Sequence, residues 1–206
     1  MNTALVRLLS KAGWPYLEIW YSGVLCEYGW FRSRRERLAI GRDGLPIPWF
    51  TYPAIHLLEN RVRPDLRVFE YGGGQGSLWW AARAAAVSVV EHHAGWAAYL
   101  AGQGLAVETV GADEDTYSQS IRGRGPFDVI VVDGLYRPEC VESAMPELAD
   151  CGVLILDDTH RLELAPTVDR LRTAGWRWLP LRGPAPVSKE LCETSLFFRE
   201  GNWLGL

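Results

Sequence analysis

Lysine is scarce in this chain, and no run of apolar residues approaches the length of a membrane span. Lys11 and Lys189 are the only lysines among 206 residues, so arginine carries nearly all of the positive charge. The formal net charge of −4 argues against a general nucleic-acid surface. Because a transmembrane helix needs about 20 consecutive apolar residues, the sequence predicts no membrane span.

Paired cysteines and a secretory leader are missing as well. The four cysteines lie far apart and form no C-x-x-C pair. The N-terminal residues lack the basic, apolar and small-residue order of a signal peptide. We therefore expect a reduced, cytoplasmic protein. A hydrophobic content of 48% and a charged content of 22% are typical of one globular domain.

Strand and helix patterns alternate from residue 64 to the end, which is typical of a parallel α/β sheet. A turn-rich RGPAP segment, with no helix, joins the last two strand patterns and predicts an antiparallel edge strand. We expect seven strands, at 66–71, 87–91, 105–110, 127–133, 152–157, 176–181 and 194–199, and helices at 77–86, 94–103, 138–149 and 161–174.

Residues 1–63 have a different character. They contain the aromatic stretch 14–31, a basic patch at 32–37 and a helix pattern at 54–62. We interpret this segment as a cap that covers a ligand on the core, residues 64–206, within one structural unit. Most of its aromatic residues are expected to be ordinary core. The basic patch could admit an RNA or another anionic acceptor, although the acidic overall balance counts against RNA.

The most informative segment is VFEYGGGQGSL, residues 68–78. An apolar strand ends at Glu70 and is followed by four glycines before a helix. Glycines at such a turn let the backbone approach a ligand without a Cβ in the way. The free N–H groups of the helix start could also receive a carboxylate or a phosphate. A nucleotide-like cofactor is the leading hypothesis.

The glycine spacing does not fit the dinucleotide fingerprint G-x-G-x-x-G, whose third position falls on Ser77 or Trp79. The observed pattern is acid-x-Gly-x-Gly-x-Gly, formed by Glu70, Gly72, Gly74 and Gly76. It resembles the first motif of the class I S-adenosylmethionine-dependent methyltransferases. That resemblance implies a Rossmann-like seven-stranded sheet, with an antiparallel last strand, and a loop that wraps the methionine part of S-adenosyl-L-methionine.

The likeness extends over nearly the whole chain. The segments DGLPIPW at 43–49, FEYG at 69–72 and VDG at 132–134 are similar to bacterial class I methyltransferase-like proteins of undefined substrate. This supports the fold and the cofactor, with S-adenosyl-L-homocysteine as its product, but not the acceptor.

Strand ends supply the other candidate cofactor ligands. Glu91 ends the second strand about 20 residues after the glycine loop, where an acid can bind both ribose hydroxyls. Asp113 follows the third strand at a turn that resembles the adenine-contacting turn of the family. Its acidic neighbours also fit a solvated loop. His92 and His93 are expected beside the adenosine.

Three further carboxylates end the fourth and fifth strands: Asp133, Asp157 and Asp158. At neighbouring strand ends they would repel one another unless protonated, separated or bridged by a cation. Mg²⁺ suits this all-oxygen environment. The pattern is similar to the metal site of catechol-type and macrolide-sugar O-methyltransferases. The alternative is that Asp133 is a general fourth-strand acid and that Asp157 and Asp158 cap the next helix.

One departure weakens the metal hypothesis. The catechol-type pattern has a lysine three residues after the fourth-strand Asp, whereas this chain has Tyr136, followed by Arg137. His160 is a candidate general base, as Asp133 is, but a histidine at a helix start is more often a polar cap residue. The pocket could also be lined by aromatic residues, at Trp49, Tyr52, Trp79 and Trp80.

The sequence thus predicts methyl transfer from S-adenosylmethionine to a hydroxyl of a small molecule or glycan, with Mg²⁺ as an optional partner. Two alternatives stay open: a non-catalytic cofactor-binding protein and a Rossmann oxidoreductase that uses NAD. The oligomeric state, including a homo-oligomer, is also left open.

Overall fold

A seven-stranded sheet forms the centre of the protein, in the strand order β3-β2-β1-β4-β5-β7-β6. The computed structural model describes Ala4 and residues 22–206. Strand β7 is antiparallel to both of its neighbours, and the pairings among the first five strands are parallel. This confirms the predicted fold class. The strands are β1 (Arg67–Tyr71), β2 (Ala86–Glu91), β3 (Val107–Thr109), β4 (Phe127–Val132), β5 (Leu148–Asp157), β6 (Arg177–Gly183) and β7 (Cys192–Phe198).

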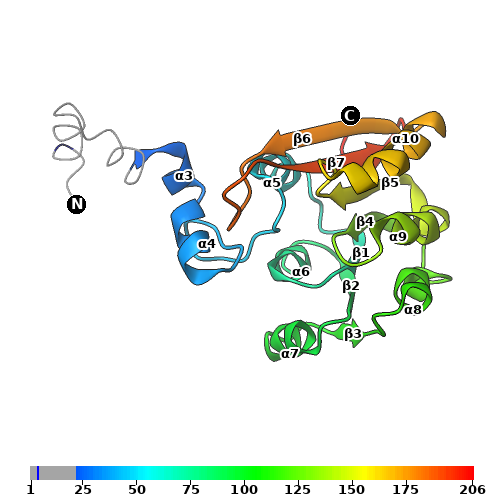
Figure 1. The fold of residues 1–206 in the computed structure, drawn as a ribbon, viewed down its shortest axis with the longest axis horizontal. Helices are drawn as coiled ribbons and strands as arrows, with labels where there is room; N and C mark the ends of the chain where they lie inside the picture. The colour runs from blue at the N-terminus through cyan, green and yellow to red at the C-terminus, as the bar shows by residue number, and fades with distance from the viewer. Residues whose placement is uncertain (1–3, 5–21) are drawn as a thin grey trace.

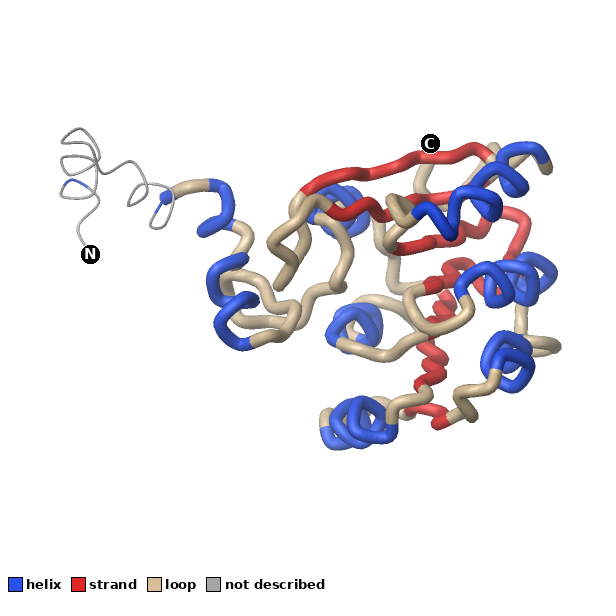
Figure 2. The backbone as a smooth tube through the Cα atoms, viewed as in Figure 1, coloured by secondary structure: helices blue, strands red, loops and turns tan. Residues whose placement is uncertain are grey.

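Helices cover both faces of this sheet (Figure 1). One face carries α5 (Tyr52–Glu59), α6 (Gln75–Ala81) and α7 (Ala94–Gly102), and the other carries α8 (Glu114–Ser118), α9 (Arg137–Ala144) and α10 (Ala165–Thr173). Short 3₁₀ turns lie at Gln119–Ile121, Met145–Glu147 and Leu162–Leu164. Helices α3 (Val24–Glu27) and α4 (Trp30–Glu36) lie to one side, next to the turn between β6 and β7 (Figure 2).

Alternating side chains on the central strands build two cores. Val68, Val129 and Val131 pack under α5 and α6 on one face, whereas Phe69 and Ile130 point to the other. This period of two is inherent to a strand. Each fully buried aliphatic side chain contributes about 1.5–3 kcal/mol to stability.

Glu70 interrupts this apolar pattern with a carboxyl group. It projects from β1 on the same face as Val68, at the carboxyl end of the strand and below the start of α6. Ligands of open parallel sheets bind at this edge.

Several element boundaries differ from the sequence prediction. The helix expected at 138–149 ends at Ala144, and β5 already begins at Leu148. The helix expected at 77–86 ends at Ala81, because the alanine-rich segment after it leads directly into β2. The acidic run after β3, for which a solvated loop was the alternative to a cofactor-contacting turn, forms the N-cap and first turn of the short helix α8.

The expected cap falls only partly within the described residues. Residues 14–21 of its aromatic stretch lie outside them, and the division into 1–63 and 64–206 stays a prediction. Helix α5 from this segment packs into the sheet core through Ala54, Ile55 and Leu58. None of the helices in the described part of the chain has the length and apolar character that crossing a membrane requires.

Candidate active site

The glycine loop leaves β1 in a conformation that only glycine suits. Gly72 has φ +87°, and a Cβ at this position would lie 2.9 Å from the carbonyl oxygen of Asp133. The loop therefore passes directly over the end of β4. A side chain here would meet backbone atoms that cannot move aside.

The N–H groups of the loop are used within the protein. Gly72 N donates to Val90 O at 3.0 Å, Gly73 N to Glu91 Oε2 at 2.8 Å, and Gly74 N to Ser77 Oγ at 3.0 Å. These three groups are therefore not free for an anion, contrary to what the helix start suggested. They make the loop rigid, so that it would meet a ligand mainly through its bare Cα atoms.

Glu70 lies beneath this loop with only 3% of its surface exposed. Ser77 Oγ donates to Glu70 Oε2, which links the carboxylate to the loop. Burial raises the pKa of Glu70 to about 8, and the hydrogen bond from Ser77 opposes this rise only in part. Glu70 lines the cavity described below, where a cationic ligand would favour its charged form.

Glu91 is fastened by backbone donors at the end of β2. Its Oε2 accepts from Gly73 N at 2.8 Å and its Oε1 from His93 N at 2.6 Å, while His92 Nδ1 lies 3.1 Å from Oε1. Each carboxylate oxygen can accept a second hydrogen bond. The carboxylate is thus fixed in place, and its Oε2 can still accept a bond from a hydroxyl group.

A cavity of about 420 Å³ opens between the loop, the ends of β1, β2 and β4, and the segments 37–39 and 48–50. We call it the glycine-loop cavity. It brings together most of the predicted cofactor residues: Glu70, Gly72, Gly74, Gly76, Glu91, Asp133, His92 and His93. Further lining residues that the sequence analysis did not assign to the site include Leu38, Ala39, Phe50, Gln75, Trp96 and Leu135.

Asp113 is not among the residues that line this cavity. Its side chain caps α8, where Oδ1 accepts from Thr116 N at 2.9 Å. That bond holds the pKa of this exposed carboxyl below its usual range. Its predicted contact with adenine stays a prediction.

A second cavity, of about 660 Å³, lies over the ends of β4, β5 and β7. We call it the carboxylate cavity. It is lined by the predicted residues Asp133, Asp157, Asp158 and His160. Asp133 and Trp49 line both cavities, so the two spaces adjoin at these side chains.

The three carboxylates form one cluster, with ligand atoms within 4.8 Å of one another. Arg137, at the start of α9, is bound into this cluster. Its Nη2 lies 2.9 Å from Asp133 Oδ1, and its Nη1 lies 3.3 Å from Asp158 Oδ2. Nη1 also donates to the carbonyl oxygen of Asp157 at 2.6 Å. The expected repulsion is therefore relieved by an arginine side chain.

Burial and mutual repulsion act on the two inner carboxyls. Burial raises the pKa of Asp133, and the Arg137 guanidinium opposes that rise. Burial, with Asp133 and Asp158 nearby, also raises the pKa of Asp157 well above its usual range. Thr194 Oγ1 donates to Asp157 Oδ1 at 2.5 Å. Asp157 therefore favours its protonated form, so it is not free to take a proton from an acceptor.

His160 lies at the open side of the carboxylate cavity. Its Nδ1 is 4.0 Å from Asp158 Oδ1, and about a third of its side chain is exposed. The position neither caps a long helix nor packs into the core. The imidazole can therefore reach a molecule in the cavity.

Side chains from the N-terminal part hold the turn between β6 and β7 over the same cavity. Trp30 Nε1 donates to Ser188 O at 2.8 Å, and Arg34 Nη1 donates to Val187 O at 2.6 Å. Trp49 Nε1 lies 3.3 Å from Ser188 Oγ. Val187 has φ +64°, which is rare for a β-branched residue and persists only where the surroundings impose it.

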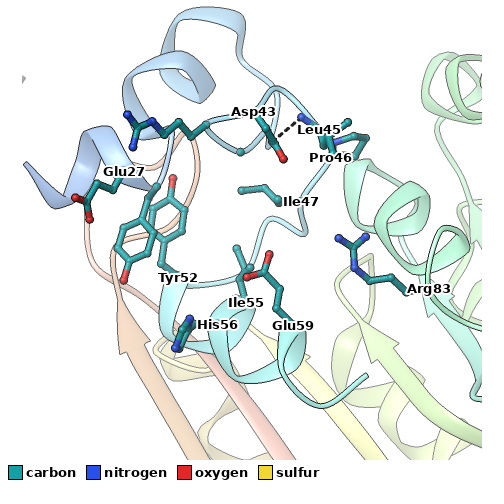
Figure 3. A pocket seen from close by; sticks show the side chains of 13 residues that line it. Glu27, Asp43, Leu45, Pro46, Ile47, Tyr52, Ile55, His56, Glu59 and Arg83 are labelled. Atoms are coloured by element: carbon teal, nitrogen blue, oxygen red, sulfur yellow. Dashed lines mark hydrogen bonds between the residues drawn. The ribbon is translucent and has the colours of Figure 1, made fainter. Parts of the chain in front are cut away.

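The other predicted pocket aromatics lie elsewhere. Trp79 and Trp80 are 1% and 0% exposed and belong to the core under α6, so they do not line the glycine-loop cavity. Tyr52 lines a third cavity, of about 550 Å³, between α5 and the loop around Pro46 (Figure 3). Figure 3 shows Glu59 and Arg83 pointing into that space. Apart from Tyr52, it contains none of the predicted catalytic, cofactor-binding or metal-ligating residues.

Comparison with known proteins finds likeness in structure alone. No family model matches the chain, and no curated protein matches it. One similar solved structure is the O-methyltransferase TomG from Streptomyces achromogenes, in complex with S-adenosylmethionine and involved in tomaymycin synthesis. It is 21% identical over 92% of this chain and 98% of its own, with a TM-score of 0.57.

Two further similar structures are of methyltransferases whose names indicate different acceptors. Precorrin-6y C5,15-methyltransferase from Geobacter metallireducens is 14% identical over 79% of this chain and 98% of its own, with a TM-score of 0.58. An rRNA methylase from Streptococcus thermophilus is 12% identical over 72% and 97%, with a TM-score of 0.50. The strand order agrees with these similar structures, and so does the glycine loop at the carboxyl edge of the sheet. The chain has the fold of the class I S-adenosylmethionine-dependent methyltransferases.

Proposed function

We propose that this protein transfers a methyl group from S-adenosylmethionine to a hydroxyl of a small molecule or glycan. The observation that carries the proposal is the meeting of two cavities at Asp133 and Trp49. One cavity has the glycine loop and two strand-end acids, and the other has carboxylates and an imidazole. A donor and an acceptor held in these spaces would meet at Asp133.

The glycine-loop cavity is the proposed donor site. Its loop offers a close, side-chain-free approach to the methionine part, and Glu91 presents a fixed carboxylate to the ribose hydroxyls. Glu70 supplies negative charge below the loop. Bound there, S-adenosylmethionine supplies a methyl group already activated on a sulfonium.

The carboxylate cavity is the proposed acceptor site. In such a transfer the acceptor oxygen would form a bond to the methyl carbon as the carbon–sulfur bond broke, and the sulfur would leave as a neutral thioether. The hydroxyl proton passes to Asp133 Oδ2 or to His160, since both groups face the cavity. The protein therefore contributes mainly alignment and removal of a proton.

Gly74 offers a direct test of the donor site. A Cβ on Gly74 would meet no heavy atom within 4 Å, and its φ of −166° is extended backbone that any residue adopts. Gly74→Val should therefore fold normally and place its side chain in the cavity. Gly102→Val is the matched control, because a Cβ on Gly102 also meets nothing within 4 Å, at the far end of α7.

Calorimetry with S-adenosylhomocysteine measures the effect. We expect wild type and Gly102→Val to bind alike, and Gly74→Val to lose at least about tenfold in affinity, or about 1.4 kcal/mol. Equal binding by all three proteins would contradict the donor site. Tighter binding of NAD than of S-adenosylhomocysteine would favour an oxidoreductase, and binding without turnover of any hydroxylated acceptor would favour a non-catalytic protein.

A further inference from the structure

We propose that Arg137 occupies the cation position of the carboxylate cluster, so that methyl transfer in this protein needs no bound divalent metal. The inference rests on the proposed function for its acceptor site. Its evidence is independent of any acceptor, because it concerns contacts between Arg137 and the ends of β4 and β5. It replaces the Mg²⁺ that the spacing of the three aspartates predicts.

The carboxylates alone would suit Mg²⁺. Three carboxylate groups with oxygens within 4.8 Å of one another match the oxygen ligands that this ion takes from proteins. The site therefore has the right donor atoms. What differs from a metal site is the positive group already placed among them.

Arg137 is held there by many contacts. Besides the two carboxylates, its guanidinium donates to the carbonyl oxygen of Asp157 at 2.6 Å and, through Nε, to that of Gly134 at 3.2 Å. Only 12% of the side chain is exposed. To admit a metal ion, the arginine would have to give up these bonds together.

The local backbone explains why the arginine points inward. Tyr136 adopts a left-handed conformation, with φ +47°, and Arg137 follows as the first residue of α9. The helix therefore starts directly beside Asp133 and directs the arginine across the ends of β4 and β5. This is the place where the sequence departs from the catechol-type pattern, with Tyr136 in place of the expected lysine.

The geometry also gives Arg137 a positioning role. It holds Asp133 through Oδ1, which leaves Oδ2 directed to other partners. Asp133 lines both cavities, so fixing its carboxylate fixes the group that would receive the acceptor proton. The arginine thereby supplies the charge balance and the orientation for which a metal ion would otherwise be needed.

Binding of Mn²⁺ tests the proposal without any substrate. The loss of the electron paramagnetic resonance signal of free aqueous Mn²⁺ measures binding to wild type, Arg137→Met and Arg161→Met. Arg161 is the matched control: it also pairs with Asp158, but half of its side chain is exposed and it does not contact Asp133 in the structure. S-adenosylhomocysteine binding and circular dichroism report on the fold of each variant.

We expect wild type and Arg161→Met to bind Mn²⁺ weakly or not at all. Arg137→Met should gain roughly a hundredfold or more in affinity, because like charges about 4 Å apart repel strongly in a partly buried site. Asp157→Asn added to Arg137→Met should remove the gain. If Arg137→Met does not fold, Arg137→Gln replaces it.

Three results would overturn the proposal: tight Mn²⁺ binding by wild type that Asp157→Asn abolishes, no gain in a folded Arg137 variant, or an equal gain in Arg161→Met. Failure of S-adenosylhomocysteine to bind wild type would instead refute the proposed function and leave the Mn²⁺ results standing. The two failures are thus distinguishable.

Discussion

The buried carboxyl of Glu70 should make the stability of the protein depend on pH. Burial at the end of β1 raises its pKa from the ordinary value of 4.5 to about 8, and the charges of Asp133 and Glu91 act in the same direction. The folded chain therefore binds this proton more tightly than the unfolded chain does. Glu70 accordingly stabilises the fold most when it is protonated.

The sign and size of the effect follow from linkage. The contribution is complete below pH 4.5 and declines as the pH rises to about 8, at about 1.4 kcal/mol per pH unit. Over the whole interval this amounts to at most about 5 kcal/mol. Glu70→Gln removes the titrating group, so the free energy of unfolding of the variant should rise relative to wild type across this range.

Urea unfolding at pH 5, 6, 7 and 8 measures the difference between the two proteins. Glu163→Gln is the control, since its side chain is 73% exposed and lies outside both cavities. Parallel stability curves for wild type and Glu70→Gln would refute the reasoning. The affinity for S-adenosylmethionine should also rise with pH in wild type and stay flat in Glu70→Gln, because a bound cation favours the charged carboxylate.

Two further predictions concern the carboxyl edge of the sheet. Trp30→Phe removes the hydrogen bond to the carbonyl oxygen of Ser188. Because this loss costs about 1 kcal/mol, amide hydrogen exchange at 184–191 should become about fivefold faster. Unchanged exchange would show that the bond does not hold the turn. Thr194→Val leaves the Asp157 carboxyl without its hydroxyl partner. The free energy of unfolding, measured by denaturant titration, should fall by about 1–3 kcal/mol. An unchanged free energy of unfolding would place the partner of Asp157 elsewhere.

The sheet was predictable where the strands are mostly apolar. The strand expected at 127–133 is β4 (Phe127–Val132), and the one expected at 66–71 is β1 (Arg67–Tyr71), because burial on both faces leaves a nearly continuous apolar run. Helix ends were less predictable. Proline at 146 permits the short 3₁₀ turn that ends α9 early, and alanine-rich sequence does not distinguish the end of α6 from the start of β2.

The residues of the candidate site that lie at strand ends were predictable. Glu70, Glu91 and Asp133 follow from the rule that ligands bind at the carboxyl edge. Trp96 and the segment 37–39 could not be predicted, since they reach the cavity through packing between distant segments. The sequence did contain an indication of Arg137, because this cation directly follows the position where the catechol-type pattern has a lysine. Only the structure shows that Arg137 lies within the carboxylate cluster.

The contacts that join Trp30 and Arg34 to the turn between β6 and β7 connect residues more than 150 positions apart. One wall of the carboxylate cavity is therefore encoded near the two ends of the chain, whereas the glycine-loop cavity is encoded mostly in the first half. A chimera with a relative would need to exchange the α4 segment together with the hairpin formed by β6 and β7. Exchange of either one alone would leave a mismatched wall in the carboxylate cavity and would leave the glycine loop unchanged.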